Sequence, residues 1–141
     1  MKNILIRLAS ILTVTCFAGI TTAHAAQVVF LDFDSGSDGA IVYSGAMRDQ
    51  IEALMEGHYA DFDIIVTQVA PGAGDFSTVT FNAGGAGGLA SQVDFRNTDM
   101  NDTAVVNIDS FGLATTADIV SASAIIGSHE FGHLLGLRHG D

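Results

Sequence analysis

Residues 129–139 read HEFGHLLGLRH and hold three of the five histidines in the chain. His129 and His133 are four residues apart, so on a helix their rings project from one face, about one turn apart. Glu130 follows His129 directly and is rotated around the helix, which places it beside a shared ion rather than on it. The spacing therefore predicts a helix that binds a metal ion and carries a carboxylate able to take a proton from water.

Two later residues extend this motif. Gly136 comes three residues after His133, and glycine readily adopts the left-handed backbone that ends a helix and lets the chain turn back. His139 then arrives as a third imidazole. Three neutral imidazoles without a cysteine suit a zinc ion that keeps one position open for water. We therefore predict that His129, His133 and His139 bind Zn²⁺ and that Glu130 is the catalytic base.

The rest of the sequence predicts one α+β domain around this motif. Runs rich in β-branched and aromatic residues predict strands at residues 27–34, 63–69, 77–82, 89–95 and 103–109. Apolar residues at helical spacing predict an amphipathic helix at 44–59. A largely apolar segment predicts a buried second helix at about 116–135, which carries the histidines. The first strand, the first helix and the second strand favour a right-handed parallel crossover.

The N-terminal segment has the pattern of a secretory signal. Lys2 and Arg7 precede an apolar run at residues 8–20, and the sequence A-H-A ends at Ala25. The run is shorter than the roughly 20 residues that a membrane span needs. We expect cleavage after Ala25, which leaves 141 − 25 = 116 residues at positions 26–141 and removes Cys16, the single cysteine. The mature protein is expected to be secreted, to the extracellular space or the periplasm.

Charge restricts the partners of the mature chain. All 16 acidic residues lie after Ala25, together with only three arginines, so the formal charge is 3 − 16 = −13 with the histidines neutral. This balance argues against binding of nucleic acid or of an anionic membrane surface. It is compatible with bound cations, and Ca²⁺ is a possible second ion for which the sequence indicates no particular ligands. Without cysteine, a disulfide scaffold or a thiolate metal site is excluded.

Two other acidic motifs fit known chemistry less well. Asp32 and Asp34 in VFLDFDSG are spaced as in dehalogenase-type phosphatases, but the lysine which such a site needs is available only as Lys2, in the signal. We interpret the pair as a solvated strand end followed by a turn. Residues 34–39 (DSGSDG) are similar to the start of a calcium-binding loop, yet Gly45 stands where the bidentate glutamate is expected.

A glycine-rich run and a fourth histidine have structural interpretations. Residues 84–90 (GGAGGLA) contain a G-x-G-x-x-A match, but no convincing helix follows, which argues against a dinucleotide site. We expect the glycines at 84–88 to allow a mobile loop beside an edge strand. His58 lies on the apolar side of the predicted first helix and is expected to be a core or boundary residue rather than a ligand.

His129, Glu130, His133, Gly136 and His139 match the metzincin consensus H-E-x-x-H-x-x-G-x-x-H at every fixed position. The chain resembles a secreted bacterial zinc metallopeptidase of matrixin-like type. The resemblance implies a zincin-like α+β fold, with a twisted mixed five-stranded sheet and two helices, the second being the active-site helix. It implies an endopeptidase that binds a protein or peptide along an edge strand, here residues 89–95. We expect a monomer.

The chain departs from the metzincin pattern after His139. Metzincins continue into a C-terminal subdomain with a methionine turn beneath the zinc, and this sequence ends at Asp141. We expect residues 26–141 to be the upper subdomain of such a domain, truncated after the third histidine. Two alternatives stay open: a zinc-binding module without proteolytic activity, and a zinc hydrolase that acts on another substrate. Asp109 and Asp141 are candidate hydrogen-bond acceptors for the histidines by nearness alone.

Overall fold

The computed structural model describes residues 26–140, so the predicted signal at 1–25 and Asp141 lie outside it. The described chain has five strands, two α-helices and one short 3-10 helix. In chain order they are β1 (Gln27–Asp32), α1 (Gly45–His58), β2 (Ile64–Thr67), β3 (Ser77–Phe81), β4 (Gly87–Ala90), β5 (Thr103–Asn107), η1 (Asp109–Phe111) and α2 (Thr116–Leu134). No helix of residues 26–140 is long and apolar enough to cross a membrane.

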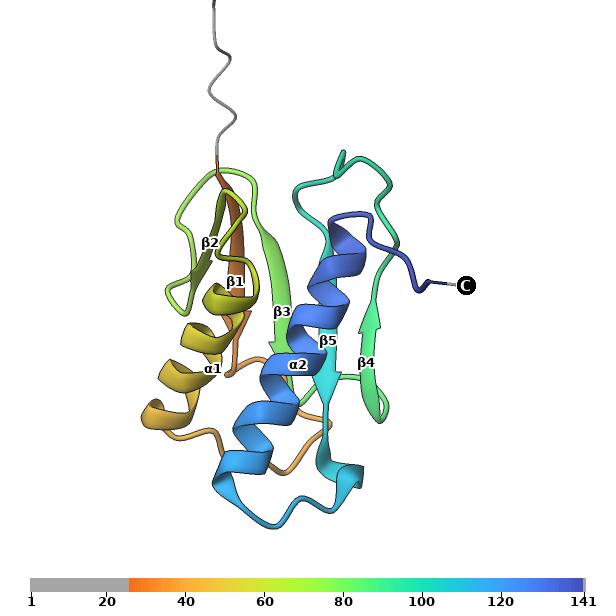
Figure 1. Ribbon diagram of the computed structural model, residues 1–141. Coiled ribbons are helices and arrows are strands. Elements are labelled where there is room, and N and C mark those ends of the chain that lie inside the picture. The colour runs from red at the N-terminus through yellow and green to blue at the C-terminus, as the bar shows by residue number, and fades with distance from the viewer. Residues whose placement is uncertain (1–25, 141) are drawn as a thin grey trace, which may run out of the picture.

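The five strands form a single mixed sheet in the order β2-β1-β3-β5-β4. Neighbouring strands from β2 to β5 are parallel, and β4 pairs with β5 in the antiparallel direction at the edge. Both helices lie over the same face of this sheet, α1 against β2 and α2 across β3, β5 and β4 (Figure 1). The predicted α+β class, the mixed five-stranded sheet and the parallel relation of the first two strands are confirmed.

The core lies between the sheet and the two helices. Side chains of a strand alternate between its two faces, and every second residue of β1 and β3 is buried, as in Leu31 and Phe81. Phe81 stacks on Phe33 with ring centroids 4.2 Å apart, and Tyr43 packs against both rings. This alternation fixes which face of the sheet is covered, and thereby the side from which α2 presents its residues.

Helix α1 has the predicted amphipathic pattern. Ser44 caps its first turn, because the hydroxyl accepts a hydrogen bond from the N–H of Met47. Met47, Ile51 and Met55 form its buried stripe. His58, expected in or at the edge of the core, is instead exposed, and its Nδ1 is 2.8 Å from the hydroxyl oxygen of Ser128. That prediction was wrong, because the imidazole lies at the surface beside Ser128 of α2 rather than among the buried residues of α1.

Two strands differ from their predicted bounds for identifiable reasons. β1 ends at Asp32 rather than at residue 34, since the Asp32 carboxylate accepts the N–H groups of Asp34 and Ser35 and forms a turn. β4 spans Gly87–Ala90, not residues 89–95. The chain leaves the sheet soon after Ala90, and the N–H of Asp94 donates to the carbonyl of His133 on α2.

The second helix is less buried than predicted. α2 packs on α1 and on the sheet through one face, which includes Ala124, Gly127 and Phe131. Gly127 allows close approach of α1, because a Cβ there would lie 3.2 Å from the sulfur of Met55. The opposite face is uncovered among residues 26–140, and Ile125 is 58% exposed. The prediction of a buried second helix thus holds for one face of α2 only.

Candidate metal centre

The three predicted histidines converge at the C-terminal end of α2. The Nε2 atoms of His133 and His139 are 3.1 Å apart, and those of His139 and His129 are 2.8 Å apart. Zn–N bonds of about 2.0–2.1 Å in a tetrahedral site place ligand nitrogens about 3.3 Å from each other. The three rings thus point their nitrogens at one place of the size that a single small cation needs.

Local helix geometry places the first two rings. His129 and His133 lie on α2 with ring centroids 4.7 Å apart, as expected for residues one turn apart on the same face. His129 is exposed and His133 half-buried. Their nitrogens therefore reach the surface of the molecule, where an ion from solvent has access.

A Schellman turn brings the third ring back to the helix. The N–H of Gly136 donates to the carbonyl of His133, and the N–H of Leu137 donates to that of Gly132, both at 2.9 Å. Gly136 has φ +86°, in the left-handed region. A Cβ at Gly136 would also lie 2.7 Å from the carbonyl oxygen of Asp94. Glycine is required here for its backbone conformation, as the sequence predicted. It is also required for space, which the sequence did not predict.

The same turn orients His133. Its Nδ1 lies 2.7 Å from the carbonyl oxygen of Leu137. A carbonyl can only accept, so the proton resides on Nδ1 and the lone pair of Nε2 faces the other imidazoles. The acceptor is a backbone group rather than either suggested carboxylate. Asp109 lies at the start of η1 and accepts the N–H of Ala40, and Asp141 is outside the described residues.

Glu130 lies next to the histidines but is held by the sheet. Its side chain is buried, and Oε2 accepts the N–H of Ala90 on β4 at 2.9 Å. Gly88 provides the space, since a Cβ there would be 2.5 Å from the Glu130 Cγ. The carboxylate borders a cleft of about 300 Å³ that is lined by Gly88, Leu89, Ala90, Gln92, Val93, His129, Glu130, His133 and His139.

On the other side of the histidines, Tyr59 supports the helix. Its hydroxyl donates to the carbonyl of Ser128, and its ring packs edge-on against Phe131 with centroids 5.2 Å apart. Burial raises the pKa of Tyr59 to about 12, so the hydroxyl keeps its proton at neutral pH. This contact ties the residue before His129 to the end of α1.

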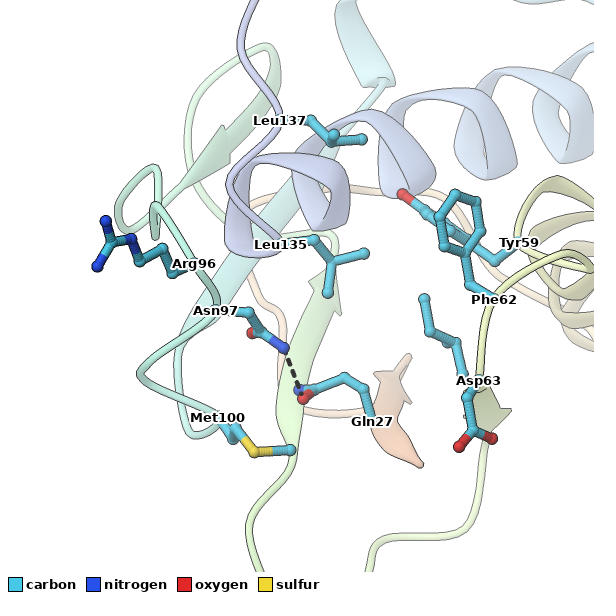
Figure 2. Close-up of a pocket in the computed structure, with 10 residues that line it drawn as sticks. Gln27, Tyr59, Phe62, Asp63, Arg96, Asn97, Met100, Leu135 and Leu137 are labelled. Carbon is cyan, nitrogen blue, oxygen red and sulfur yellow. Dashed lines mark hydrogen bonds between the residues drawn. The ribbon is translucent and has the colours of Figure 1, made fainter. Parts of the chain in front are cut away.

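A cavity larger than these clefts, with none of the three histidines in its lining, also lies in the described part of the chain. It has a volume of about 490 Å³ and opens between the start of β1, the segment after α1 and the end of α2 (Figure 2). Leu135 and Met100 line it, and Asn97 donates to the Gln27 side chain across it. Its lining is mainly apolar and has no set of converging metal ligands, so the candidate metal centre is confined to the smaller clefts at the histidines.

The other motifs do not assemble comparable sites in the described residues. Asp34 forms a two-pronged ion pair with Arg48, at 2.7 and 3.1 Å, which lowers the pKa of its carboxyl. Asp38 accepts the N–H of Gly84. In residues 26–140 the three histidines are the one group of three or more His, Cys, Asp or Glu side chains whose ligand atoms converge. Binding of Ca²⁺ elsewhere stays a prediction.

Sequence reasoning missed the contribution of β4 to the centre. Gly87 and Gly88 were expected in a loop, but they are the first residues of the strand. A glycine within a strand often marks the close approach of another group, and at Gly88 that group is Glu130. Comparison of the chain with protein-family models, with curated proteins and with solved structures gave no significant match.

Proposed function

We propose that the protein is an exported zinc-dependent endopeptidase of the metzincin type, with a zincin-like fold. One observation carries the proposal: three Nε2 atoms converge beside a buried carboxylate, in a cleft that borders the free edge of a sheet. Each feature taken alone is compatible with a purely structural role. Their combination matches the requirements of peptide-bond hydrolysis, namely a metal, a base and a place for an extended chain.

The donor set fits zinc. Three neutral imidazoles leave one tetrahedral position open, which is the pattern of catalytic rather than structural zinc sites. The hydrogen bond from His133 Nδ1 to the Leu137 carbonyl fixes the tautomer that a metal ligand needs. When bound, zinc polarises the substrate carbonyl and lowers the pKa of water toward about 7.

Glu130 is the proposed base. It would accept the proton of the attacking water and deliver it to the leaving amine. The Ala90 N–H holds Oε2, so the carboxylate is fixed between the sheet and the histidines before substrate arrives. Burial of the side chain on the sheet side leaves it accessible from the cleft only, which is where the water must lie.

Strand β4 is the proposed binding site for the substrate backbone. In the described part of the chain it is an edge strand, paired with β5 alone. An extended peptide can add to such an edge through main-chain hydrogen bonds. Leu89 is 69% exposed at this edge, so it can contact substrate side chains. The sequence predicted that a protein or peptide binds along the segment from Leu89 to Phe95. With the bounds of β4 as they are, we propose that it binds along Gly87–Ala90 and the residues that follow.

The test uses purified protein with one equivalent of Zn²⁺ and a fluorescent unfolded protein as substrate. We expect turnover that a chelator abolishes and Zn²⁺ restores. Glu130→Gln should lower kcat by at least about 100-fold, the usual contribution of a general base, while zinc affinity stays the same. Glu56→Gln, an exposed glutamate on α1, is the matched control and should leave kcat unchanged.

The alternative is a zinc-binding module without proteolysis. It is favoured by the exposure of His129 and His139. Stoichiometric zinc binding with no turnover of unfolded protein would support it and contradict the endopeptidase. Turnover of small esters or amides alone would instead indicate a zinc hydrolase with another substrate.

A further inference from the structure

Positive charge gathers near the C-terminal end of α2, where Arg138 lines a cleft with the three histidines and Arg96 lines the neighbouring apolar cavity. Residues 26–140 contain three arginines and no lysine. Arg48 is paired with Asp34 at the far end of α1. The other two, Arg96 and Arg138, lie at the ring of Phe95, with guanidinium carbons 5.6 and 5.4 Å from its centroid. Among the described residues, neither has a carboxylate within 4.0 Å.

This Arg96–Phe95–Arg138 cluster is fixed to the end of the active-site helix. The N–H of Asp94, which precedes Phe95, donates to the carbonyl of His133. The backbone of Phe95 packs on Gly136, where a Cβ would lie 3.2 Å from the Phe95 Cα. Arg138 directly precedes His139 and lines a cleft of about 220 Å³ together with all three histidines. The loop after β4 passes the C-terminal end of α2 on this side (Figure 1).

We propose that the Arg96–Phe95–Arg138 cluster binds an acidic side chain of the polypeptide substrate. The inference rests on the proposed endopeptidase function and names the substrate class for that site. Two guanidinium groups share one aromatic ring, and each stacks favourably on it while they repel each other. An Asp or Glu carboxylate offers both groups charge-assisted hydrogen bonds and offsets their repulsion.

The net charge of the protein does not oppose this preference at contact range. A formal charge of −13 for the mature chain attracts cationic peptides from a distance, but salt screens that field over about 8 Å at physiological ionic strength. Glu130 is the one acidic residue in the lining of the cleft beside β4, and Asp94 and Asp99 belong to the loop that carries Phe95. Glu130 accepts from Ala90, Asp94 accepts from Thr98 and Asp99, and Asp99 accepts from Gln92. Contact with the two arginines therefore decides the local preference.

The direction of β4 predicts where the acidic residue lies. The strand runs from Gly87 to Ala90, and the chain after it leads to Phe95 at the end of α2. Antiparallel pairing is the more stable arrangement, and a peptide added in that direction has its N-terminal part at the Ala90 end. We therefore expect the cluster to bind a residue on the N-terminal side of the bond that is cleaved.

The test uses Glu130→Gln protein and labelled peptides that carry Glu, Gln or Lys on either side of a fixed central sequence. Fluorescence anisotropy measures binding and needs no turnover. We expect the peptide with N-terminal Glu to bind about 10-fold more tightly than the one with Lys, with a smaller difference at high salt. Arg138→Gln should reduce this preference by about threefold to fivefold, the range of an exposed ion pair. Arg48→Gln makes the same charge change and should leave it intact.

Charge reversal is the decisive variant. In the Glu130→Gln background, R96E/R138E should prefer Lys over Glu on the N-terminal side only, a positional preference that neither misfolding nor the net negative charge can produce. Equal binding of Glu and Lys peptides, or a Glu preference confined to the C-terminal side, would overturn the proposal. Preferential binding of N-terminal Glu peptides supports it even if the parent protein cleaves nothing, in which case only the endopeptidase function fails.

Discussion

Replacement of Gly136 by alanine tests whether the helix end positions His139. The residue has φ +86°, and the left-handed region costs an L-residue about 1–2 kcal/mol. The new Cβ would also lie 2.7 Å from the Asp94 carbonyl oxygen. Because that neighbour is a backbone atom, the chain itself must shift to make room for the Cβ. This shift adds about 1–3 kcal/mol, the usual cost of overpacking. The structure therefore predicts a total cost of about 2–5 kcal/mol for Gly136→Ala.

This cost divides between two measurable quantities. If metal-free protein keeps the turn, its free energy of unfolding falls by the full amount. If the turn relaxes without metal, the cost reappears when His139 must return to the cluster, and zinc affinity falls. A loss of about 2 kcal/mol in affinity corresponds to about 30-fold. Urea unfolding of metal-free protein and zinc competition against a chromophoric chelator measure the two parts.

Two matched variants identify the origin of the effect. A Cβ at Gly140 would have nothing within 4 Å, so Gly140→Ala should change neither quantity by more than about 0.5 kcal/mol. Asparagine adopts the left-handed conformation more readily than alanine, but its Cβ keeps the close contact with Asp94. The losses for Gly136→Asn should therefore lie between those for Gly140→Ala and Gly136→Ala. If Gly136→Ala matches Gly140→Ala in both unfolding and zinc affinity, the role assigned to this turn is wrong.

Three further changes have defined outcomes. Gly88→Ala would bring a Cβ 2.6 Å from the Glu130 Oε1, so kcat should fall at least about 10-fold with unchanged zinc affinity, whereas Gly85→Ala, with open space around it, should be neutral. Burial raises the pKa of Asp102, so its contribution to stability is present below the usual value of 3.8 and is lost as pH rises through the folded pKa. Asp102→Asn should thus gain free energy of unfolding, relative to the parent, between about pH 3 and pH 7 in urea titrations; a difference independent of pH contradicts this. Zinc at 100 times its dissociation constant should add about 2.7 kcal/mol to the free energy of unfolding, and His139→Ala should lose most of that gain in a thermal melt.

The elements that sequence predicted well are those made by local contacts. The stripe Met47, Ile51 and Met55 and the Ser44 cap depend on residues at most four apart. His129 and His133 are likewise four apart, and the hydrogen bonds of the turn at Gly136 join residues three and five apart. Because helix geometry relates such neighbours in a fixed way, their spacing in the sequence is sufficient to place them in space.

The sequence did not predict the bounds of β4 or the surroundings of Glu130. Alternation along residues 89–95 is compatible with several pairings, and only the partner β5 selects Gly87–Ala90. The hydrogen bond between Ala90 and Glu130 joins residues 40 apart in the chain. The sequence placed Gly88 in a loop. Its role is to leave space for the Glu130 side chain, and that contact depends on the tertiary structure.

By itself, the sequence determined that three imidazoles and a carboxylate occupy one helix and the turn that ends it. Only the tertiary structure decided that the carboxylate lies against an edge strand, and that Arg96 and Arg138 meet at Phe95 beside the histidines. The physical reason is the range of the contacts. Spacing along the chain encodes neighbours within one or two helical turns, whereas contacts between distant segments depend on how the sheet and both helices pack together.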